Sequence, residues 1–246
     1  MPKLTVANLD RHWAWTSRMF RTEHKRWVNL FDEALTRTSD LLAELEGKRQ
    51  LAENCSYLLL SKAVNHILSM WHLANHGLNI DASLCARNAV ETLLLLQICL
   101  LDPEEQYFAQ WAEGKECERA WVRKQLDLIR EVSVREIIYS RSSDEDGENS
   151  FIYGWLSKIT HANAESFSHS TRAKGANSFE VIVGGDTQGT ASMVNTLFVI
   201  SLSKLVFTEV LCASVLRLEW LEERKDQFNS LSKAVHALAK EYTQHT

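Results

Sequence analysis

Residues 83–101 read SLCARNAVETLLLLQICLL, and this stretch decides the fold class. From Leu93 onward it is apolar on nearly every side of a helix, which predicts a helix at the centre of a hydrophobic core. The chain of 246 residues contains only two prolines and nine glycines. Scarce turn residues leave long uninterrupted segments, which favours helices over a loop-rich β protein. We therefore expect an all-α protein.

Helical periodicity continues on both sides of this stretch. We expect a bundle of about seven helices that forms one domain over residues 1–246, with one small β-hairpin near residues 166–189. The parts are a long first helix over residues 10–46, a core over residues 50–163, and C-terminal helices over residues 190–243. Apolar residues of the first helix repeat every seven positions, which suits packing on a neighbouring helix or on a second copy of the chain. This stripe consists of Trp13, Phe20, Trp27, Ala34 and Leu41.

Turn residues predict where the helices end. Gly47 ends the first helix and Gly77 ends the second, because glycine is the common residue just beyond a helix C-terminus. Asp102 and Pro103 have the properties of an N-cap and a first helical residue, so a further helix is expected to begin there and to end near Glu136. The two C-terminal helices are expected to meet near residues 222–225.

Composition limits the compartment and the partners. The net charge of −5 gives no global attraction to nucleic acid or to an anionic membrane. The five cysteines are odd in number and contain no C-x-x-C pair, which indicates thiols in a reducing compartment. Residues 1–20 have no apolar core of a signal peptide, and no apolar run reaches the length of a membrane span. We therefore expect a cytoplasmic protein without a membrane segment.

Polar residues at helical spacing mark one candidate site. Arg87 and Glu91 are four residues apart on the apolar helix, so they share a face and pair. Among apolar neighbours they form either a structural ion pair or one wall of an internal polar site. Ser157 and His161 are also four residues apart, and a histidine that titrates near neutral pH acts as acid, base or phosphate contact. The structural alternative is a histidine held at a helix C-terminus by the helix dipole.

These motifs resemble a known group of proteins. The R-x-x-x-E helix, then Asp102-Pro103 and Trp111, then the S-x-x-x-H helix resemble a group of uncharacterised bacterial proteins, a domain of unknown function, over residues 54–163. That group is in turn similar to HEPN-type domains (higher eukaryotes and prokaryotes nucleotide-binding). The resemblance implies a helical bundle, often dimeric, of a kind that includes toxin and defence ribonucleases. It places one polar cluster at Arg87, Glu91, Ser157 and His161.

The ribonuclease signature itself falls elsewhere in this chain. HEPN ribonucleases carry R-x₄₋₆-H on one helix, and the match here is Arg18 with His24 on the first helix. Basic residues in the same segment alternate with tryptophans, a pattern typical of phosphate contacts and base stacking. The alternative is a solvated basic face of an amphipathic helix. The candidate nucleic-acid contacts are Arg18, Arg21, Lys25 and Arg26.

Other ligand motifs are weaker. His72 and His76 have a spacing that binds metal from one helix face, but no acidic residue follows His72 as in H-E-x-x-H. We therefore expect neither a metal nor a cofactor. The sequence supports a non-catalytic helical interaction module, in bacterial stress or defence, that binds a partner protein or itself as a homodimer. The alternative is a HEPN-like nucleic-acid-binding protein or ribonuclease that binds RNA, which leaves the question of an enzyme open.

Overall fold

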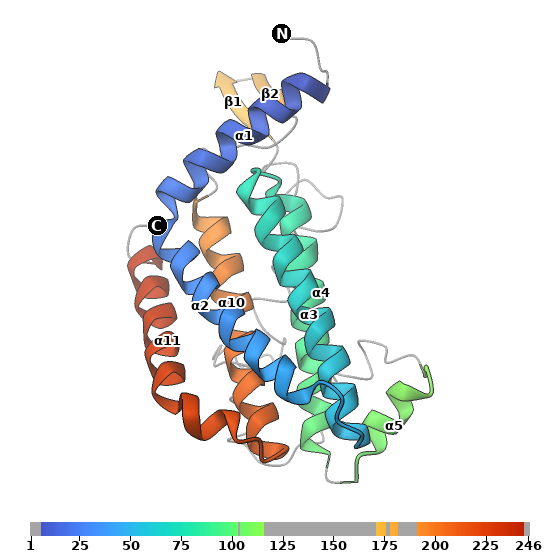
Figure 1. Ribbon diagram of the computed structural model, residues 1–246. Helices are drawn as coiled ribbons and strands as arrows, with labels where there is room; N and C mark the ends of the chain where they lie inside the picture. Colours follow the sequence, from blue (N-terminus) through green and yellow to red (C-terminus); the bar gives the residue numbers. More distant parts are fainter. Residues whose placement is uncertain (1–5, 103, 116–170, 176–177, 182–190, 244–246) are drawn as a thin grey trace, which may run out of the picture.

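The computed structural model describes residues 6–102, 104–115, 171–175, 178–181 and 191–243 (Figure 1). Helices account for most of these residues, so the predicted all-α helical bundle is confirmed. The expected helix end near Glu136 and the short helix with Ser157 and His161 lie outside the described residues. The helices are α1 (Val6–Glu23), α2 (Lys25–Leu45), α3 (Leu51–Asn75), α4 (Asn79–Leu101), α5 (Gln106–Ala112), α10 (Ala191–Val215) and α11 (Trp220–Thr243).

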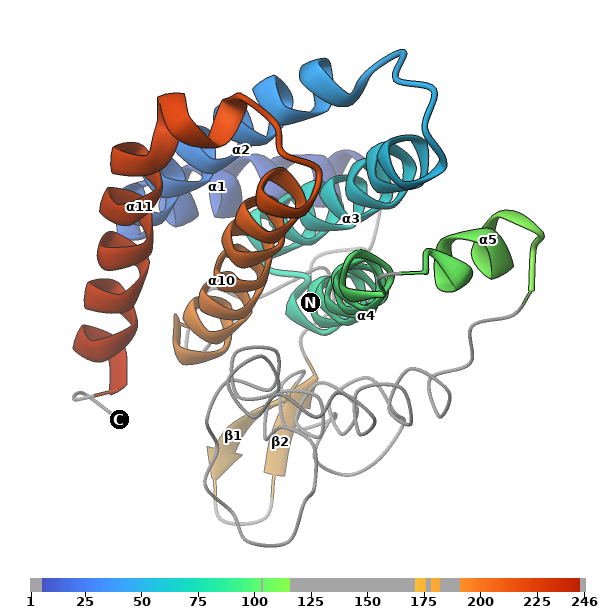
Figure 2. The same ribbon diagram turned by 90° about the horizontal axis from the view of Figure 1, so that it is seen from below.

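Helices α4 and α10 both lie inside the bundle. Helix α10 packs against α2, α3, α4 and α11, and α4 packs against α3, α10 and α5. The view from below shows α10 between the α2/α11 pair and the α3/α4 pair (Figure 2). The prediction that residues 83–101 form a central helix is therefore confirmed, and α10 is a second helix inside the bundle.

An aromatic cluster fills the core near the N-terminal end of α10. The Phe198 ring on α10 lies 4.9 Å from Phe31 and 5.2 Å from Trp71, measured between ring centroids. Phe20 and Trp27 approach the same ring at 5.9 Å and 5.7 Å. Mostly edge-on or tilted contacts of this kind add stability beyond the buried area. The cluster joins α1, α2, α3 and α10 at one point.

The expected long helix over residues 10–46 is wrong, because it is divided at His24. His24 has φ −107° and ψ 26°, outside the helical region, although hydrogen bonds to and from its backbone continue on both sides. A straight helix of this length would run about 55 Å, well beyond the roughly 38 Å of α3. The bend instead lays α1 against the C-terminal end of α3, where Ser17 Oγ accepts a hydrogen bond from Asn75 Nδ2 at 2.7 Å.

The seven-residue stripe of this segment lies inside the bundle. Phe20, Trp27, Ala34 and Leu41 are buried, and Trp13 is half-buried. The Trp27 indole also donates a 2.7 Å hydrogen bond to Asn195 Oδ1 on α10. The stripe therefore packs on neighbouring helices of the same chain and leaves no seam for a second copy.

Glycine stops were predicted correctly, but one helix end uses arginine. Gly47 and Gly77 have φ values of 74° and 77° just beyond α2 and α3. After α10 the same left-handed position is held by Arg217, with φ 54°. The Leu218 N–H bonds back to the Ala213 carbonyl at 2.9 Å, which is the 6→1 bond of a Schellman cap. The last two helices consequently meet at residues 216–219 and not near residues 222–225.

The segment after α4 begins differently from the expectation. Asp102 follows α4, and its carboxylate accepts hydrogen bonds from the backbone N–H groups of Glu104 at 3.2 Å and Tyr107 at 3.0 Å. Helix α5 begins only at Gln106, after Glu105 in a left-handed conformation. Asp102 therefore accepts hydrogen bonds within the turn that precedes α5, and this helix begins later than expected, at Gln106.

Two short strands lie within the range where the excursion from the bundle was expected. Strand β1 (Thr171–Gly175) pairs antiparallel with β2 (Ser178–Val181), with Thr171 opposite Val181. The register shifts between Ala173 and Gly175. The neighbouring parts of residues 166–189 lie outside the described residues.

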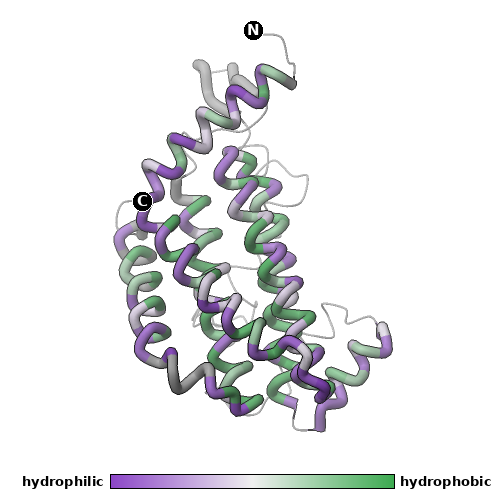
Figure 3. The backbone as a smooth tube through the Cα atoms, viewed as in Figure 1, coloured by the Kyte–Doolittle hydropathy of each residue, from purple (hydrophilic) through white to green (hydrophobic). Residues whose placement is uncertain are grey.

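Two described helices are long and apolar enough to cross a membrane. They are α4 and residues 193–215 of α10, and hydrophobic residues dominate both (Figure 3). Core helices of soluble proteins meet the same criterion, and 56% of each apolar window is buried inside the chain. The expectation of a cytoplasmic protein without a membrane segment stays a prediction.

Candidate functional site

The outer side of α1 carries an exposed basic and aromatic surface, here called the α1 face. Trp15 is 47% exposed and Met19 is 37% exposed, which is unusual for such large apolar side chains. Helical spacing places Arg11 and Arg18 one turn from Trp15 on either side, and Met19 one turn beyond Trp15. The α1 face consists of Arg11, Trp15, Arg18, Met19 and Arg21, all exposed.

The inner side of α1 fixes this face relative to the bundle. Phe20 is buried, with its ring centroid 5.5 Å from that of Trp71 on α3. Trp13 lies edge-on to His76 at 6.0 Å. These contacts, with the Asn75–Ser17 hydrogen bond, hold α1 so that its outer side faces solvent in an orientation set by the core.

Neighbouring groups partly order the α1 face itself. The Arg11 guanidinium donates to Asn8 Oδ1 and to the Ala7 carbonyl, the latter at 3.3 Å. The His12 ring stacks on Trp15 with centroids 6.2 Å apart. A preordered surface loses less conformational entropy on binding than one with free side chains.

The four predicted basic contacts do not form one surface. Arg18 and Arg21 belong to the α1 face, and Lys25 is exposed at the start of α2. Arg26 forms a bidentate ion pair with Glu241 of α11 at 2.5 Å and 3.1 Å. This exposed pair links α2 to α11, and it could not be predicted because the two residues are 215 positions apart along the chain.

His24, the other half of the R-x₄₋₆-H match, is buried at the bend between α1 and α2. Its ring centroid lies 4.7 Å from that of Phe20. Burial lowers the pKa of His24, which keeps the imidazole neutral near pH 7. A buried neutral histidine turned into the core cannot act on a ligand at the α1 face.

Arg87 and Glu91 form the predicted pair, but they are not buried as expected. Arg87 Nε lies 3.3 Å from Glu91 Oε1, and both side chains are partly exposed. Their position on α4 is therefore compatible with a solvent-accessible polar patch. Ser157 and His161 lie outside the described residues, so the shared polar cluster stays a prediction.

A fully buried ion pair in the described part of the chain joins Arg37 and Glu209, and sequence reasoning missed it. The Arg37 Nε donates to Glu209 Oε2 at 3.0 Å, and the two side chains are 3% and 0% exposed. Arg37 Nη2 and the Thr38 hydroxyl also bond to this carboxylate. Burial raises the pKa of Glu209, whereas the guanidinium and the hydroxyl oppose that rise. Because both side chains are shielded from solvent, this geometry indicates a structural role for the pair.

The described cysteines are poorly suited to nucleophilic catalysis. Burial raises the pKa of Cys212 to about 12. Burial also raises the pKa of Cys85, and the Asp81 carboxylate adds to that rise. A nucleophilic cysteine needs a lowered pKa, so these thiols remain protonated and unreactive near pH 7.

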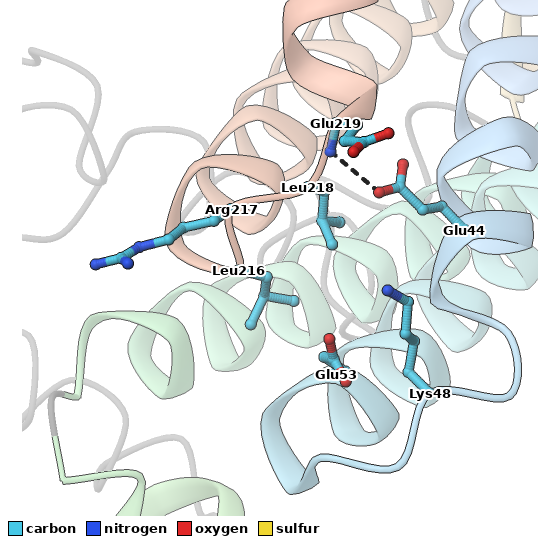
Figure 4. Close-up of a pocket in the computed structure, with 7 residues that line it drawn as sticks. All are labelled: Glu44, Lys48, Glu53, Leu216, Arg217, Leu218 and Glu219. Atoms are coloured by element: carbon cyan, nitrogen blue, oxygen red, sulfur yellow. Dashed lines mark hydrogen bonds between the residues drawn. The ribbon is translucent and has the colours of Figure 1, made fainter.

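One open hollow of about 490 Å³ lies where the ends of α2 and α10 meet (Figure 4). The backbone N–H of Glu219 donates to Glu44 Oε1 at 3.2 Å across its edge. Figure 4 shows the Lys48 amine turned toward the hollow and the Arg217 side chain turned away. Mixed charge and the absence of any metal-ligand cluster among the described residues leave this hollow without a metal-binding geometry.

The histidine pair of α3 is explained by helix termination. The rings of His72 and His76 lie 4.5 Å apart, but His76 Nδ1 bonds to the carbonyl oxygen of His72 at 2.7 Å. His76 is also the residue that caps α3 before Gly77. Both observations tie His76 to the helix end rather than to a ligand.

The described geometry defines the class of protein as an all-α helical bundle with a basic and aromatic surface on its first helix. Comparison with known proteins finds no matching family model, no matching curated protein and no matching solved structure. The HEPN-like resemblance remains an expectation based on the residues quoted for it.

Proposed function

We propose that this chain is a non-catalytic helical interaction module that binds an acidic protein partner through the α1 face. The observation that carries the proposal is the exposed Trp15 with Arg11 and Arg18 one helical turn away on either side, on a helix held from behind by the core. Tryptophan and arginine are the residues most enriched among energetic hot spots of protein interfaces. A role in bacterial stress or defence is part of the same proposal and rests on the family resemblance.

The charge of the α1 face selects the partner. Three arginines on this face contrast with the net charge of −5 of the whole chain. The nearby acidic side chains, Asp10 and Glu23, lie toward the two ends of the helix. An acidic amphipathic helix would place apolar side chains on Trp15 and Met19 and carboxylates on the arginines. Single-stranded RNA fits less well, because stacking along a strand generally uses several aromatic residues and this face exposes one tryptophan.

Charge reversal on the α1 face tests the proposal. We expect Arg18→Glu/Arg21→Glu to weaken binding of a labelled amphipathic leucine–glutamate peptide at least about tenfold, and Trp15→Ala by a similar factor. Fluorescence anisotropy at about 0.15 M salt measures the affinity. The matched control, Arg49→Glu/Lys233→Glu, changes the net charge equally at exposed positions away from α1. Equal losses in both double variants, or tighter binding of labelled oligouridylate than of the peptide, would contradict a protein-binding α1 face.

The second candidate function is a HEPN-like ribonuclease that uses Arg87, Glu91, Ser157 and His161. The partly exposed Arg87–Glu91 pair favours it, because an accessible guanidinium can contact phosphate. On this candidate, purified protein cleaves single-stranded RNA, and Arg87→Ala and His161→Ala each lower the rate at least about tenfold. If both variants still cleave RNA at the wild-type rate, these residues do not form the site that cleaves it.

A further inference from the structure

Helix α3 has two faces with different periodic patterns. Its inward face packs in the core through residues that include Leu59, Ala63 and Met70. The opposite face carries a row of residues spaced alternately three and four apart, which is the spacing of a coiled-coil seam. This row, here called the α3 stripe, consists of Leu51, Asn54, Leu58, Ser61, Asn65, Leu68 and His72.

The α3 stripe is open to solvent in the single chain. Leu51, Leu58 and Leu68 are 39%, 48% and 42% exposed. Asn54 and Asn65 are also exposed, and Ser61 is half-buried. These three leucines, separated along the row by Asn54, Ser61 and Asn65, are apolar positions that gain free energy when they are covered.

The order of residues along the α3 stripe makes it complementary to itself in one antiparallel register. In that register Leu51 meets Leu68 of a second copy, and Leu58 meets Ser61. Asn54 then meets Asn65, and two amides in one layer can hydrogen-bond to each other. Polar layers of this kind fix the register of paired helices. Every layer recurs on the other side of a twofold axis, as an isologous dimer requires.

We propose that the α3 stripe is a self-association surface on which two copies of this chain pair antiparallel about a twofold axis. Tyr57 and Val64, both half-buried, extend the apolar contact along one edge. On the other edge Lys62 of each copy lies near the axis, so two like charges approach each other and weaken the pair. The proposal deepens the interaction-module function by naming one partner, but it uses no residue of the α1 face.

The size of the surface sets the expected strength. A contact through one helix from each copy belongs at the small end of specific interfaces. We therefore expect a dissociation constant on the order of micromolar. In a dimer formed through α3, the α1 face of each copy would remain available for another partner.

Sedimentation equilibrium of the full chain tests self-association. We expect wild-type protein to form dimers, and Leu58→Glu to weaken the dimer about a hundredfold, because a buried carboxylate enters the pair twice. Val215→Glu is the matched control, since Val215 is 43% exposed at the end of α10. Lys62→Gln is expected to tighten the dimer about threefold by removing the like charges. Circular dichroism confirms that each variant is folded.

Disulfide cross-linking tests the register. Under mild oxidation, Asn54→Cys/Asn65→Cys is expected to give covalent dimers, whereas Asn54→Cys alone gives no more than wild type. Parallel pairing would instead cross-link the single variant. The native Cys55, Cys99 and Cys212 are buried, which limits background.

Three results would overturn the proposal: a monomeric wild type at concentrations far above micromolar, a dimer unaffected by Leu58→Glu, or cross-linking of Asn54→Cys alone. A monomeric wild type that still binds the leucine–glutamate peptide would reject self-association and leave the α1 face standing. A dimer that does not bind the peptide would support self-association and reject the α1 face as the binding surface.

Discussion

Replacing Glu209 with leucine is expected to lower the free energy of unfolding by about 3–5 kcal/mol. The substitution removes the carboxylate that pairs with Arg37 and leaves a guanidinium in a site where it is 3% exposed. One of its nitrogens, Nη1, already has no hydrogen-bond partner among the described residues. The Phe228 ring, 5.9 Å from the guanidinium carbon, offers only a weak substitute for a carboxylate. Urea denaturation followed by circular dichroism measures the change.

The double variant Arg37→Met/Glu209→Leu separates the cost of an unpaired charge from the value of the pair. Two apolar side chains of similar volume fill the site without leaving a charge behind, so most of the lost stability should return. A double variant as unstable as Glu209→Leu would show that the pair contributes through its own interaction energy. It would also contradict the explanation given for the single variant.

Replacing Phe198 with alanine is expected to destabilise the bundle by about 3–5 kcal/mol. Phe198 is fully buried, and its ring contacts Phe20, Trp27, Phe31 and Trp71. The substitution opens a cavity at the point where four helices meet, and large aromatic neighbours can fill it only partly. The decrease appears as a lower urea midpoint with an unchanged slope.

Phe207→Ala is the matched control for this cavity. Phe207 lies on the same helix, but it is only half-buried. The same change of side chain at this position is expected to cost clearly less than at Phe198, because solvent reaches part of the space that is vacated. Equal losses of unfolding free energy at the two positions would contradict a larger contribution of the aromatic cluster to stability.

The helices were predictable wherever their periodicity and their end signals lie within a short stretch of sequence. Residues 83–101 and the stops at Gly47 and Gly77 required only periodicity and glycine chemistry. The bend at His24 and the helix end at Arg217 carried no such signal, because neither is a glycine or a proline. At both places a neighbouring apolar side chain is buried in the core: Phe20 packs on Trp71 of α3, and Leu218 is buried.

The buried ion pair could not be predicted because its partners are 172 residues apart. Arg87 and Glu91 were chosen for their spacing, yet spacing says nothing about which face of α4 is covered. A signal for Arg37 did exist: it lies between Ala34 and Leu41 on the buried side of α2, where a charge requires a partner. Its partner became visible only when α10 was placed beside α2.

The α1 face was predictable in composition but not in shape. The sequence showed basic residues alternating with tryptophans, and it could not separate those that face the core. The structure assigns Trp13 and Trp27 to the bundle and leaves Trp15 outside with Arg18 and Arg21. The bend at His24 makes this separation, because it turns α1 onto the end of α3.

Hydrogen–deuterium exchange with and without the leucine–glutamate peptide tests the interaction-module account most directly. The account predicts that the peptide slows amide exchange in residues 6–23 and leaves α4 and α10 unchanged, and that Trp15→Ala abolishes the effect. Slowed exchange around Arg87 and Glu91 with α1 unaffected, or no change anywhere at saturating peptide, would contradict it.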